Sequence, residues 1–469
     1  LAAFSLGGCQ TSDPAPPNDA SQSRNHSVTW TDADNPNVVD FNSSFNYSFA
    51  ALPIEGEAEK IPWAGSYWPT YRDSVNYRWD ASSPDSLSPA EKYAQAFGKE
   101  GITDAVSVEY GVDSMRHRTP CTTDAVCNAS TGEECSKRQG SESGFCVETW
   151  FGICHAWGPA AVNEPEPKHS VIFNGVEFKI NDIKALVTLS YDHGLKSASL
   201  SETCEVRNTG GEDGIQYNEW GIPTEEYAAC ADTNAGTFHV VIGNMLGLQR
   251  IGLVEDRTYD YEVWNQPLRG YKIWKKYPKT IDAVRANSLL GATGNKYLFN
   301  PEAVDFRHIK LSLYWITESH QETDGNLSDH IDDYTKTDVY EYIVELDATG
   351  NIIGGEWVRG SQQAHPDFLW AATEKLNTEV AVPAVELTNQ EVVVAANEFK
   401  TVGTSTGFPV TPGDKVKITM SGSADADLSV RFKYRPTETK FDCRPFRANS
   451  NEECVLEAPA GTTKVHIKV

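Results

Sequence analysis

The chain has 469 residues, and its 66 acidic side chains outnumber 40 basic ones, which gives a formal net charge of -26. This charge argues against nucleic acid as a partner, because a phosphate backbone attracts basic surfaces. Aromatic residues make up 10% of the chain, with 12 tryptophans, so the acidity is not that of a disordered chain. A chain of this length predicts more than one domain.

The first residues are typical of an export signal. Leu1 to Cys9 is apolar and ends in small residues, and Leu6-Gly7-Gly8-Cys9 resembles the bacterial lipobox, whose cysteine becomes the lipidated first residue of the mature protein. The end of an ordinary signal peptide is the alternative. We therefore expect an exported protein that is secreted or is held at the bacterial outer membrane or cell surface through a lipid on Cys9. Residues 10–45, rich in Ser, Asn, Asp and Pro, are expected to form a disordered tether.

The 10 cysteines can be sorted by position, because an oxidising destination permits disulfides. Lipidation would remove Cys9 from the count. We expect two disulfides between close pairs, Cys443 with Cys454 and Cys204 with Cys230. A third group contains no CxxC pair, so we expect it to form a two-disulfide knot rather than a zinc site: Cys121, Cys127, Cys135 and Cys146. Cys154 is then left unpaired. The alternative is that Cys154 joins the knot and another cysteine is free.

Cys154 stands at the predicted start of a helix, in Gly152-Ile153-Cys154-His155-Ala156. A helix N-terminus stabilises a thiolate through its dipole and its free N–H groups. A thiol hydrolase or acyltransferase also needs a histidine that shuttles protons and an acid or amide that orients it. His239, inside an apolar run that we interpret as a strand over 236–242, supplies the histidine. Asp256, at the end of the run 251–256, supplies the acid.

Each of these assignments has an alternative. Cys154 can be half of a disulfide, and a lone histidine on an apolar strand is usually a satisfied core residue. Asp260 and Asn265 compete with Asp256 for the third position. His155 is adjacent to Cys154, but neighbouring residues of a helix point in different directions, which favours His239 as the base.

Alternation and turn residues predict the remaining elements. Helices are expected at 88–97, capped by Ser88, and at 182–191, with strands at 171–180, 308–315, 339–346 and 352–357 and a turn at 347–351. The stretch 262–273 is interpreted as a turn-containing connection. From about 385, alternating runs predict a small β-sandwich, among them 392–394, 415–420, 428–432 and 464–467.

Several stretches resemble known families. The run Val263-Trp264-Asn265-Gln266-Pro267-Leu268-Arg269-Gly270-Tyr271-Lys272-Ile273 closely resembles the surface peptide of the oomycete cell-wall transglutaminase elicitor, which plants detect. Residues 62–76, the Cys154 motif and 354–357 also look like that family, which has bacterial relatives. The C-terminal runs Ala424 to Phe432 and Phe441 to Phe446 resemble the bacterial pre-peptidase C-terminal domain, whose acids can hold calcium or form a solvated turn.

The elicitor resemblance covers roughly 60–380 and implies an α+β fold with a distantly papain-like cysteine-enzyme core and a catalytic cysteine at Cys154. The expected organisation is a signal-peptide remnant with lipobox (1–9), the tether (10–45), a transglutaminase-like catalytic domain (46–384) and a pre-peptidase C-terminal-like β-sandwich (385–469).

The resemblance also implies an activity, that of a protein-glutamine γ-glutamyltransferase. The Cys154 thiolate would attack a glutamine side chain, and a lysine or polyamine would take over the acyl group, so that protein substrates are the expected partners. No cofactor is required, and dependence on a divalent cation stays open. A papain-like protease or amidase, or a glutamine deamidase, is the enzymatic alternative, and a surface adhesin is the non-enzymatic one.

Overall fold

A computed structural model describes residue 30, residues 34–40, residues 44–375 with gaps at 193–194, 201–202, 207–213, 225, 228–229 and 231–232, residue 393, and residues 399–469 with gaps at 403–406, 411, 413–414, 423, 438 and 446–449. The chain divides into two units, Leu1–Val382 and Pro383–Val469. The boundary predicted after residue 384 lies next to this division. Among the described residues, no helix has the length and apolar character needed to cross a membrane.

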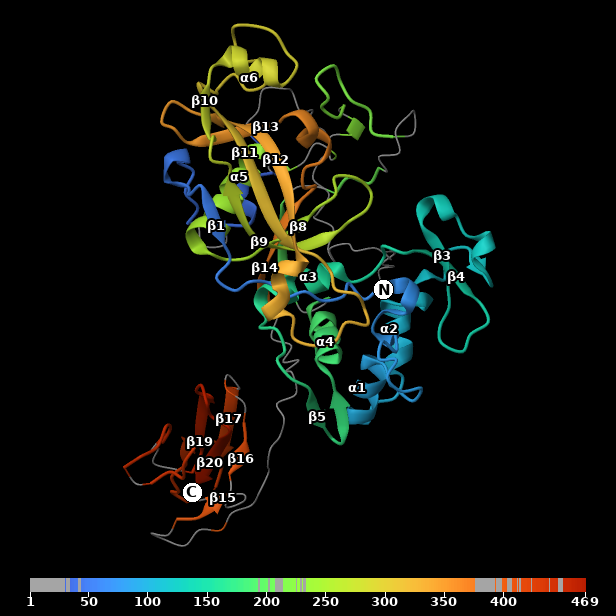
Figure 1. Ribbon diagram of the computed structural model, residues 1–469, viewed down its shortest axis with the longest axis vertical. Coiled ribbons are helices and arrows are strands. Elements are labelled where there is room, and N and C mark those ends of the chain that lie inside the picture. The colour runs from blue at the N-terminus through green and yellow to red at the C-terminus, as the bar shows by residue number, and fades with distance from the viewer. Residues whose placement is uncertain are drawn as a thin grey trace. The chain divides into compact units, whose positions relative to one another are not determined.

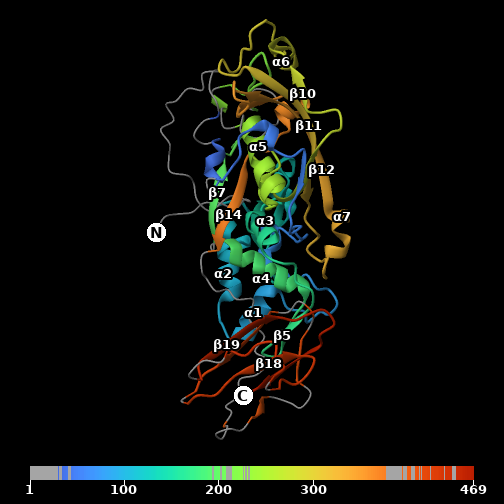
Figure 2. The ribbon, with the colours of Figure 1, turned by 90° about the vertical axis from the view of Figure 1, so that its left-hand side faces the viewer.

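A nine-stranded antiparallel sheet organises the first unit (Figure 1). Its strands run in the order β13-β12-β11-β9-β8-β14-β7, with β1 paired to β9 and β10 paired to β11. Figure 2 shows β12 towards one side of the sheet and β7 at the other. The bounds are β1 Glu55–Glu57, β7 Leu195–Leu200, β8 Val254–Asp256, β9 Asn265–Ile273, β10 Lys279–Ile281, β11 Asp305–Ile316, β12 Thr335–Leu346, β13 Ile352–Trp357 and β14 Leu369–Lys375.

The helices divide between the two faces of this sheet. Helix α5, Ala235–Ile242, lies on one face, where its Phe238 packs in a core cluster with Leu369 of β14. Helix α3, Cys154–Asn163, lies on the other face, where Cys154 shares a cluster with Trp370. Since successive residues of a strand point to opposite faces, the adjacent residues Leu369 and Trp370 place the sheet between the two helices.

The predicted helices at 88–97 and 182–191 are confirmed as α1, Pro89–Phe97, and α4, Ile180–Asp192. Ser88 caps α1 as its sequence indicated, because its hydroxyl accepts from the Glu91 N–H while the Glu91 carboxylate accepts from the Ser88 N–H. The hairpin of β12 and β13 around 347–351 is also confirmed. The other helices are α2 Ile102–Glu109, α6 Ala283–Leu289 and α7 Ile331–Tyr334, and the strands that follow α3 are β5 Val171–Phe173 and β6 Val176–Phe178.

Two predicted elements are wrong in kind. The run 236–242 is the helix α5, not a strand. The Asn234 side chain accepts from the N–H groups of Gly236 and Thr237 and so starts the helix. The stretch 262–273, interpreted as a connection, contains β9, which lies in the middle of the sheet between β8 and β11.

The predicted tether extends too far. Val39 is 2% exposed and belongs to the same core cluster as α5. Asp34 is also buried, and its backbone carbonyl accepts from the Thr237 hydroxyl. Residues 34–40 are therefore part of the first unit. Leu1 to Cys9 and most of 10–33 lie outside the described residues.

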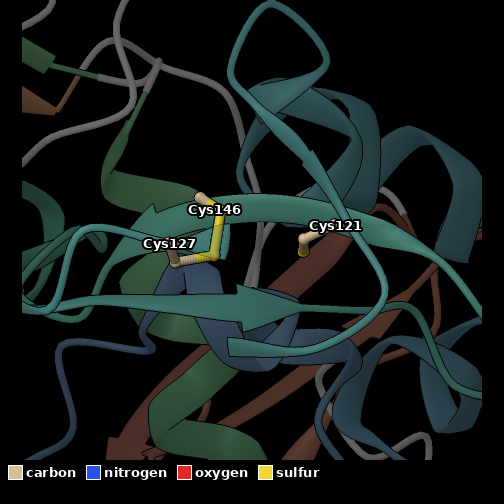
Figure 3. Close-up of side chains that lie close together, drawn as sticks. All are labelled: Cys121, Cys127 and Cys146. Atoms are coloured by element: carbon tan, nitrogen blue, oxygen red, sulfur yellow. A yellow bond between two sulfur atoms is a disulfide. The ribbon is translucent and has the colours of Figure 1, made fainter. Parts of the chain in front are cut away.

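The disulfide predictions are confirmed for eight cysteines, and four of them lie in or beside a small three-stranded sheet. Its strands are β2 Pro120–Cys121, β3 Glu133–Ser136 and β4 Gly144–Glu148. Cys121 is bonded to Cys135 and Cys127 to Cys146, and Figure 3 shows the sulfur of Cys121 beside the second bond. The sulfurs of this cluster are thus committed to disulfides. The other predicted bonds join Cys204 to Cys230 and Cys443 to Cys454.

The second unit is a small β-sandwich. One sheet contains β15, β16, β18 and β20, the other β17 and β19, and side chains from both sheets form one core cluster. The predicted strands near 415–420, 428–432 and 464–467 are present, whereas 392–394 lies almost entirely outside the described residues. The bounds are β15 Thr401–Val402, β16 Phe408–Pro409, β17 Lys415–Met420, β18 Ser429–Phe432, β19 Glu452–Glu457 and β20 Lys464–Lys468.

Candidate active site

Cys154 is the first residue of α3, as its sequence indicated. The preceding turn is fixed by Tyr67, whose carbonyl accepts from the Ile153 N–H at 2.8 Å. Further along the helix, a side chain on Gly158 would begin 3.0 Å from the Val254 side chain of β8. The small residues therefore allow α3 to lie close against the sheet, and this contact buries Cys154 completely.

The sulfur of Cys154 faces the start of β9. The Asn265 side-chain N–H donates to it at 3.5 Å, and the Val263 carbonyl oxygen lies 3.7 Å away. The Trp370 indole donates to the Asn265 side-chain oxygen at 2.7 Å. Because an indole N–H can only donate, this bond turns the amide oxygen towards Trp370 and the NH₂ towards the sulfur. A donor held in this way stabilises a thiolate more than a neutral thiol.

The expectation that Cys154 is left unpaired is wrong. Cys154 is disulfide-bonded, and its partner lies outside the described residues. The expectation came from setting Cys9 aside as a lipidation site, which left an odd number of cysteines. The alternative reading, in which Cys154 is half of a disulfide, holds in this structure.

Asp256 lies directly across from Asn265 in the pairing of β8 with β9. One of its oxygens, Oδ1, accepts from the Trp264 N–H at 2.8 Å, and from the N–H and hydroxyl of Thr258 at 3.2 and 3.1 Å. The other, Oδ2, is buried and has no hydrogen-bond partner in the described part of the chain. Burial raises the pKa of Asp256 to about 8. The structure thus brings Asp256 to the site, beside the amide that contacts the sulfur.

His239 is not brought to Cys154. It lies in α5, across the sheet, where its Nδ1 forms a hydrogen bond of 2.7 Å with the Tyr342 hydroxyl and its ring stacks on Phe49. Burial lowers the pKa of His239 to about 4, so the ring is neutral at physiological pH. These contacts are those of a satisfied core histidine, which was the alternative stated above.

His155 points away from the sulfur, as expected for the next residue along a helix. Its Nε2 lies 2.5 Å from the Asp192 carboxylate at the end of α4, whereas Cys154 faces β9. The His155–Asp192 pair therefore joins α3 to α4. Asp260 lies in the loop between β8 and β9 together with Thr258, near Asp256.

Two buried indoles lie in the cluster that packs around Ile153 and the following turn of α3. The indole N–H groups of Trp68 and Trp157 have no acceptor among the described residues. Trp68 also has φ of +46°, a left-handed conformation that is costly for a bulky residue. Hydrogen bonds from Ile153 to Tyr67 and from Thr70 to Phe151 hold the Trp68 backbone beside the start of α3.

Trp370 is the residue of this candidate site that sequence reasoning missed. It acts through Asn265, from a strand that is 105 residues further along the chain and that no local pattern indicated. Asn265 itself was considered only as a rival for orienting a histidine, whereas in the structure it contacts the sulfur.

The comparisons with known proteins identify the family and the fold. A profile of the family described as "Transglutaminase elicitor" matches residues 39–398. The crystal structure of the GP42 transglutaminase from Phytophthora sojae matches with a TM-score of 0.61 and 37% sequence identity, over 74% of this chain and 91% of that one. The chain belongs to the transglutaminase elicitor family. The expected α+β fold class and the family resemblance are both confirmed.

Curated relatives match over much shorter stretches. A virulence metalloprotease of Vibrio anguillarum is 42% identical over 57 residues, which is 12% of this chain and 9% of that protein. An alkaline serine exoprotease A of Vibrio alginolyticus is 44% identical over 50 residues, 10% of this chain and 9% of that protein. Since the chain spans less than a tenth of each of these proteases, their activities are not carried over by the match.

Proposed function

We propose that this protein is a protein-glutamine γ-glutamyltransferase that uses Cys154 as its nucleophile. The support is the family, together with one local observation: the residue at the start of α3 is a cysteine whose sulfur receives a hydrogen bond from the buried Asn265 amide. A helix N-terminus and a fixed N–H donor both favour the thiolate over the thiol. The reaction needs that thiolate, and therefore needs the Cys154 disulfide to be reduced.

The reaction has two halves. The thiolate attacks the γ-carboxamide carbon of a protein glutamine, and the C–N bond breaks to release ammonia and leave a thioester on Cys154. A lysine or polyamine nitrogen then attacks the thioester carbon, the C–S bond breaks, and an isopeptide bond forms as the thiolate is restored. Water in place of the amine gives deamidation, so a glutamine deamidase is the competing outcome.

Both halves pass through a tetrahedral intermediate with a negatively charged oxygen. The backbone N–H groups at the start of α3 and a buried indole N–H are the donors that we assign to this oxygen. Trp68 is the stronger candidate for the indole, since its backbone is hydrogen-bonded beside Ile153 and its N–H has no acceptor in the described part of the chain. The Tyr67 and Trp264 rings, 5.8 Å apart, lie near the same turn and would favour an amine over water by excluding solvent.

The test is incorporation of a labelled primary amine into a casein-like protein, in the presence of a thiol reductant. Wild-type protein should incorporate the amine and Cys154→Ala should not. Intact incorporation by Cys154→Ala refutes the proposal. Peptide cleavage without incorporation identifies a papain-like protease instead, and binding to sugar or protein that survives Cys154→Ala identifies an adhesin.

The remaining expectations extend the proposal. The disulfides support an exported protein. Attachment to a membrane through a lipid on Cys9 would block the Cys9 sulfur from forming any disulfide, and it is testable by labelling with a radioactive fatty acid. The C-terminal β-sandwich is proposed as an appended module of the pre-peptidase C-terminal kind. We propose that catalysis needs no metal ion, because the nucleophile and the donors are all protein groups; loss of incorporation in EDTA that returns with calcium would overturn this.

A further inference from the structure

We infer that Asp256 is the general acid and base of the proposed reaction and exchanges protons directly with Cys154. Sequence reasoning gave this role to a histidine. This inference rests on the proposed function and goes beyond it, because that function fixes the nucleophile but not the acid and base. Sequence reasoning assigned Asp256 only to orient His239, which the sheet separates from Cys154.

The position of Asp256 follows from the register of the sheet. Asp256 and Asn265 are directly opposite each other in β8 and β9, so their side chains leave the same face, about 5 Å apart at Cβ. The Asn265 amide contacts the Cys154 sulfur, and Val254, two residues before Asp256, packs against α3 at Gly158. The face that carries Asp256 is therefore the face that carries the nucleophile.

The two carboxyl oxygens of Asp256 have different surroundings. Oδ1 accepts three hydrogen bonds from Thr258 and Trp264, and these fix the loop between β8 and β9. Oδ2 is buried without any partner in the described structure. A carboxylate that is held by one oxygen, with the second oxygen unpaired on the face of the sheet that carries the nucleophile, is arranged to take and return a proton.

Burial keeps the proton on Asp256, and the charge of Asp260 adds to this effect. Glu255 precedes it in β8, Asp260 lies in the following loop, and the Asp367 N–H donates to the Asp256 carbonyl from the segment before β14. Arg257 is the neighbouring cation, and it is paired with Asp338. Burial, together with the charge of Asp260, raises the pKa of Asp256 to about 8, whereas an ordinary thiol has a pKa of about 8.5. The start of α3 and the Asn265 N–H lower the thiol pKa below this ordinary value, so transfer of the thiol proton to the Asp256 carboxylate is favourable.

The proton balance closes over one cycle. Cys154 gives its proton to Asp256, which leaves a thiolate and a carboxylic acid. As the C–N bond of the glutamine breaks, the acid protonates the departing nitrogen, and ammonia leaves. The Asp256 carboxylate then takes one proton from the attacking amine as the new C–N bond forms and the C–S bond breaks. The thiolate and the carboxylic acid are restored, and no other reactant is needed.

Asp256→Asn separates this role from the structural one. Asparagine keeps an oxygen for the three loop hydrogen bonds, but its NH₂ cannot take or release a proton. We expect amine incorporation by the reduced enzyme to fall about a hundredfold or more, and the alkaline limb of the wild-type pH–rate profile, with its midpoint near 8, to disappear. Thr258→Val is the matched control, because it removes the hydroxyl that donates to Oδ1 and to the Glu262 carbonyl but leaves the acid in place. Since the hydroxyl bond lowers the pKa of Asp256, the alkaline limb of this variant should remain and should move to higher pH.

Three outcomes decide the question. Loss of the alkaline limb in Asp256→Asn, with an unchanged melting midpoint, supports the inference. An Asp256→Asn variant with wild-type rate and pH profile overturns it, while an inactive Cys154→Ala protein would still uphold the transglutaminase proposal. If Asp256→Asn does not fold, the wild-type profile decides: a rate that shows no ionisation between about pH 7 and 9 overturns the inference.

Discussion

Replacing Asn265 with alanine should raise the pKa of the Cys154 thiol. The Asn265 N–H donates to the sulfur at 3.5 Å in a fully buried setting. A hydrogen bond to a charged group contributes about 1.5–3 kcal/mol, and one pKa unit corresponds to about 1.4 kcal/mol. The thiol pKa should therefore rise by about 1 to 2 units. The same change leaves the Trp370 indole without its acceptor, which should lower the free energy of unfolding by about 1–3 kcal/mol.

The pH dependence of iodoacetamide alkylation at Cys154, measured after reduction, reports the thiol pKa directly. Asn265→Asp is the informative second variant, because it keeps an oxygen for Trp370 but places a carboxylate against the sulfur. We expect it to raise the thiol pKa further than alanine does, while the Trp370 indole keeps its acceptor. A thiol pKa in Asn265→Ala equal to that of wild type would refute the assignment of Asn265 as the group that stabilises the thiolate.

Three further predictions follow from the site. Since Cys154 is disulfide-bonded, amine incorporation and iodoacetamide labelling should both require a reductant, and labelling of unreduced protein would contradict this. His239→Gln should keep the wild-type rate per folded molecule, and an inactive but stable variant would restore the histidine triad. The pKa of His239 is lowered from 6.5 to about 4 by folding, so the wild-type protein should lose stability as the pH falls from 6.5 to about 4. The variant should not show this loss. Trp68→Phe should lower kcat about a hundredfold with little change in KM or in the alkylation rate of Cys154. The control is Trp79→Phe, which removes an indole that donates to Asp182 and should lower the melting midpoint instead. Equal rates in both variants would show that Trp68 is not part of the site.

Local signals allowed much of the fold to be predicted. The Ser88 capping box, the hairpin at 347–351 and the disulfide pairs depend on residues close in sequence, and all are confirmed. Helix α5 was mistaken for a strand for a physical reason. All of its residues are buried, so its sequence lacks the polar face that gives a helix its period, and Val240, Val241 and Ile242 favour a strand.

The site was only half predictable. The start of α3 at Cys154 could be inferred, because small residues and a helix N-terminus leave a local pattern. The contact of Asn265 with Cys154 and Trp370 depends on the register of β8, β9 and β14, which brings together residues more than a hundred positions apart. Local periodicity carries no information about such pairing. The disulfide bond of Cys154 was missed because the count of cysteines set Cys9 aside as a lipidation site.

The run that carries the family likeness is a central strand. Within β9, Lys272 is the one exposed residue and Arg269 is partly exposed, and the rest are buried. A receptor or antibody that reads this segment as a linear peptide would find almost none of it on the folded protein. Recognition of this segment should therefore require that the protein is unfolded or cleaved. Antibodies raised against a synthetic peptide of 263–273 should bind the denatured or proteolysed protein and fail to bind the native protein. A host that detects this segment would in effect detect the breakdown of the protein.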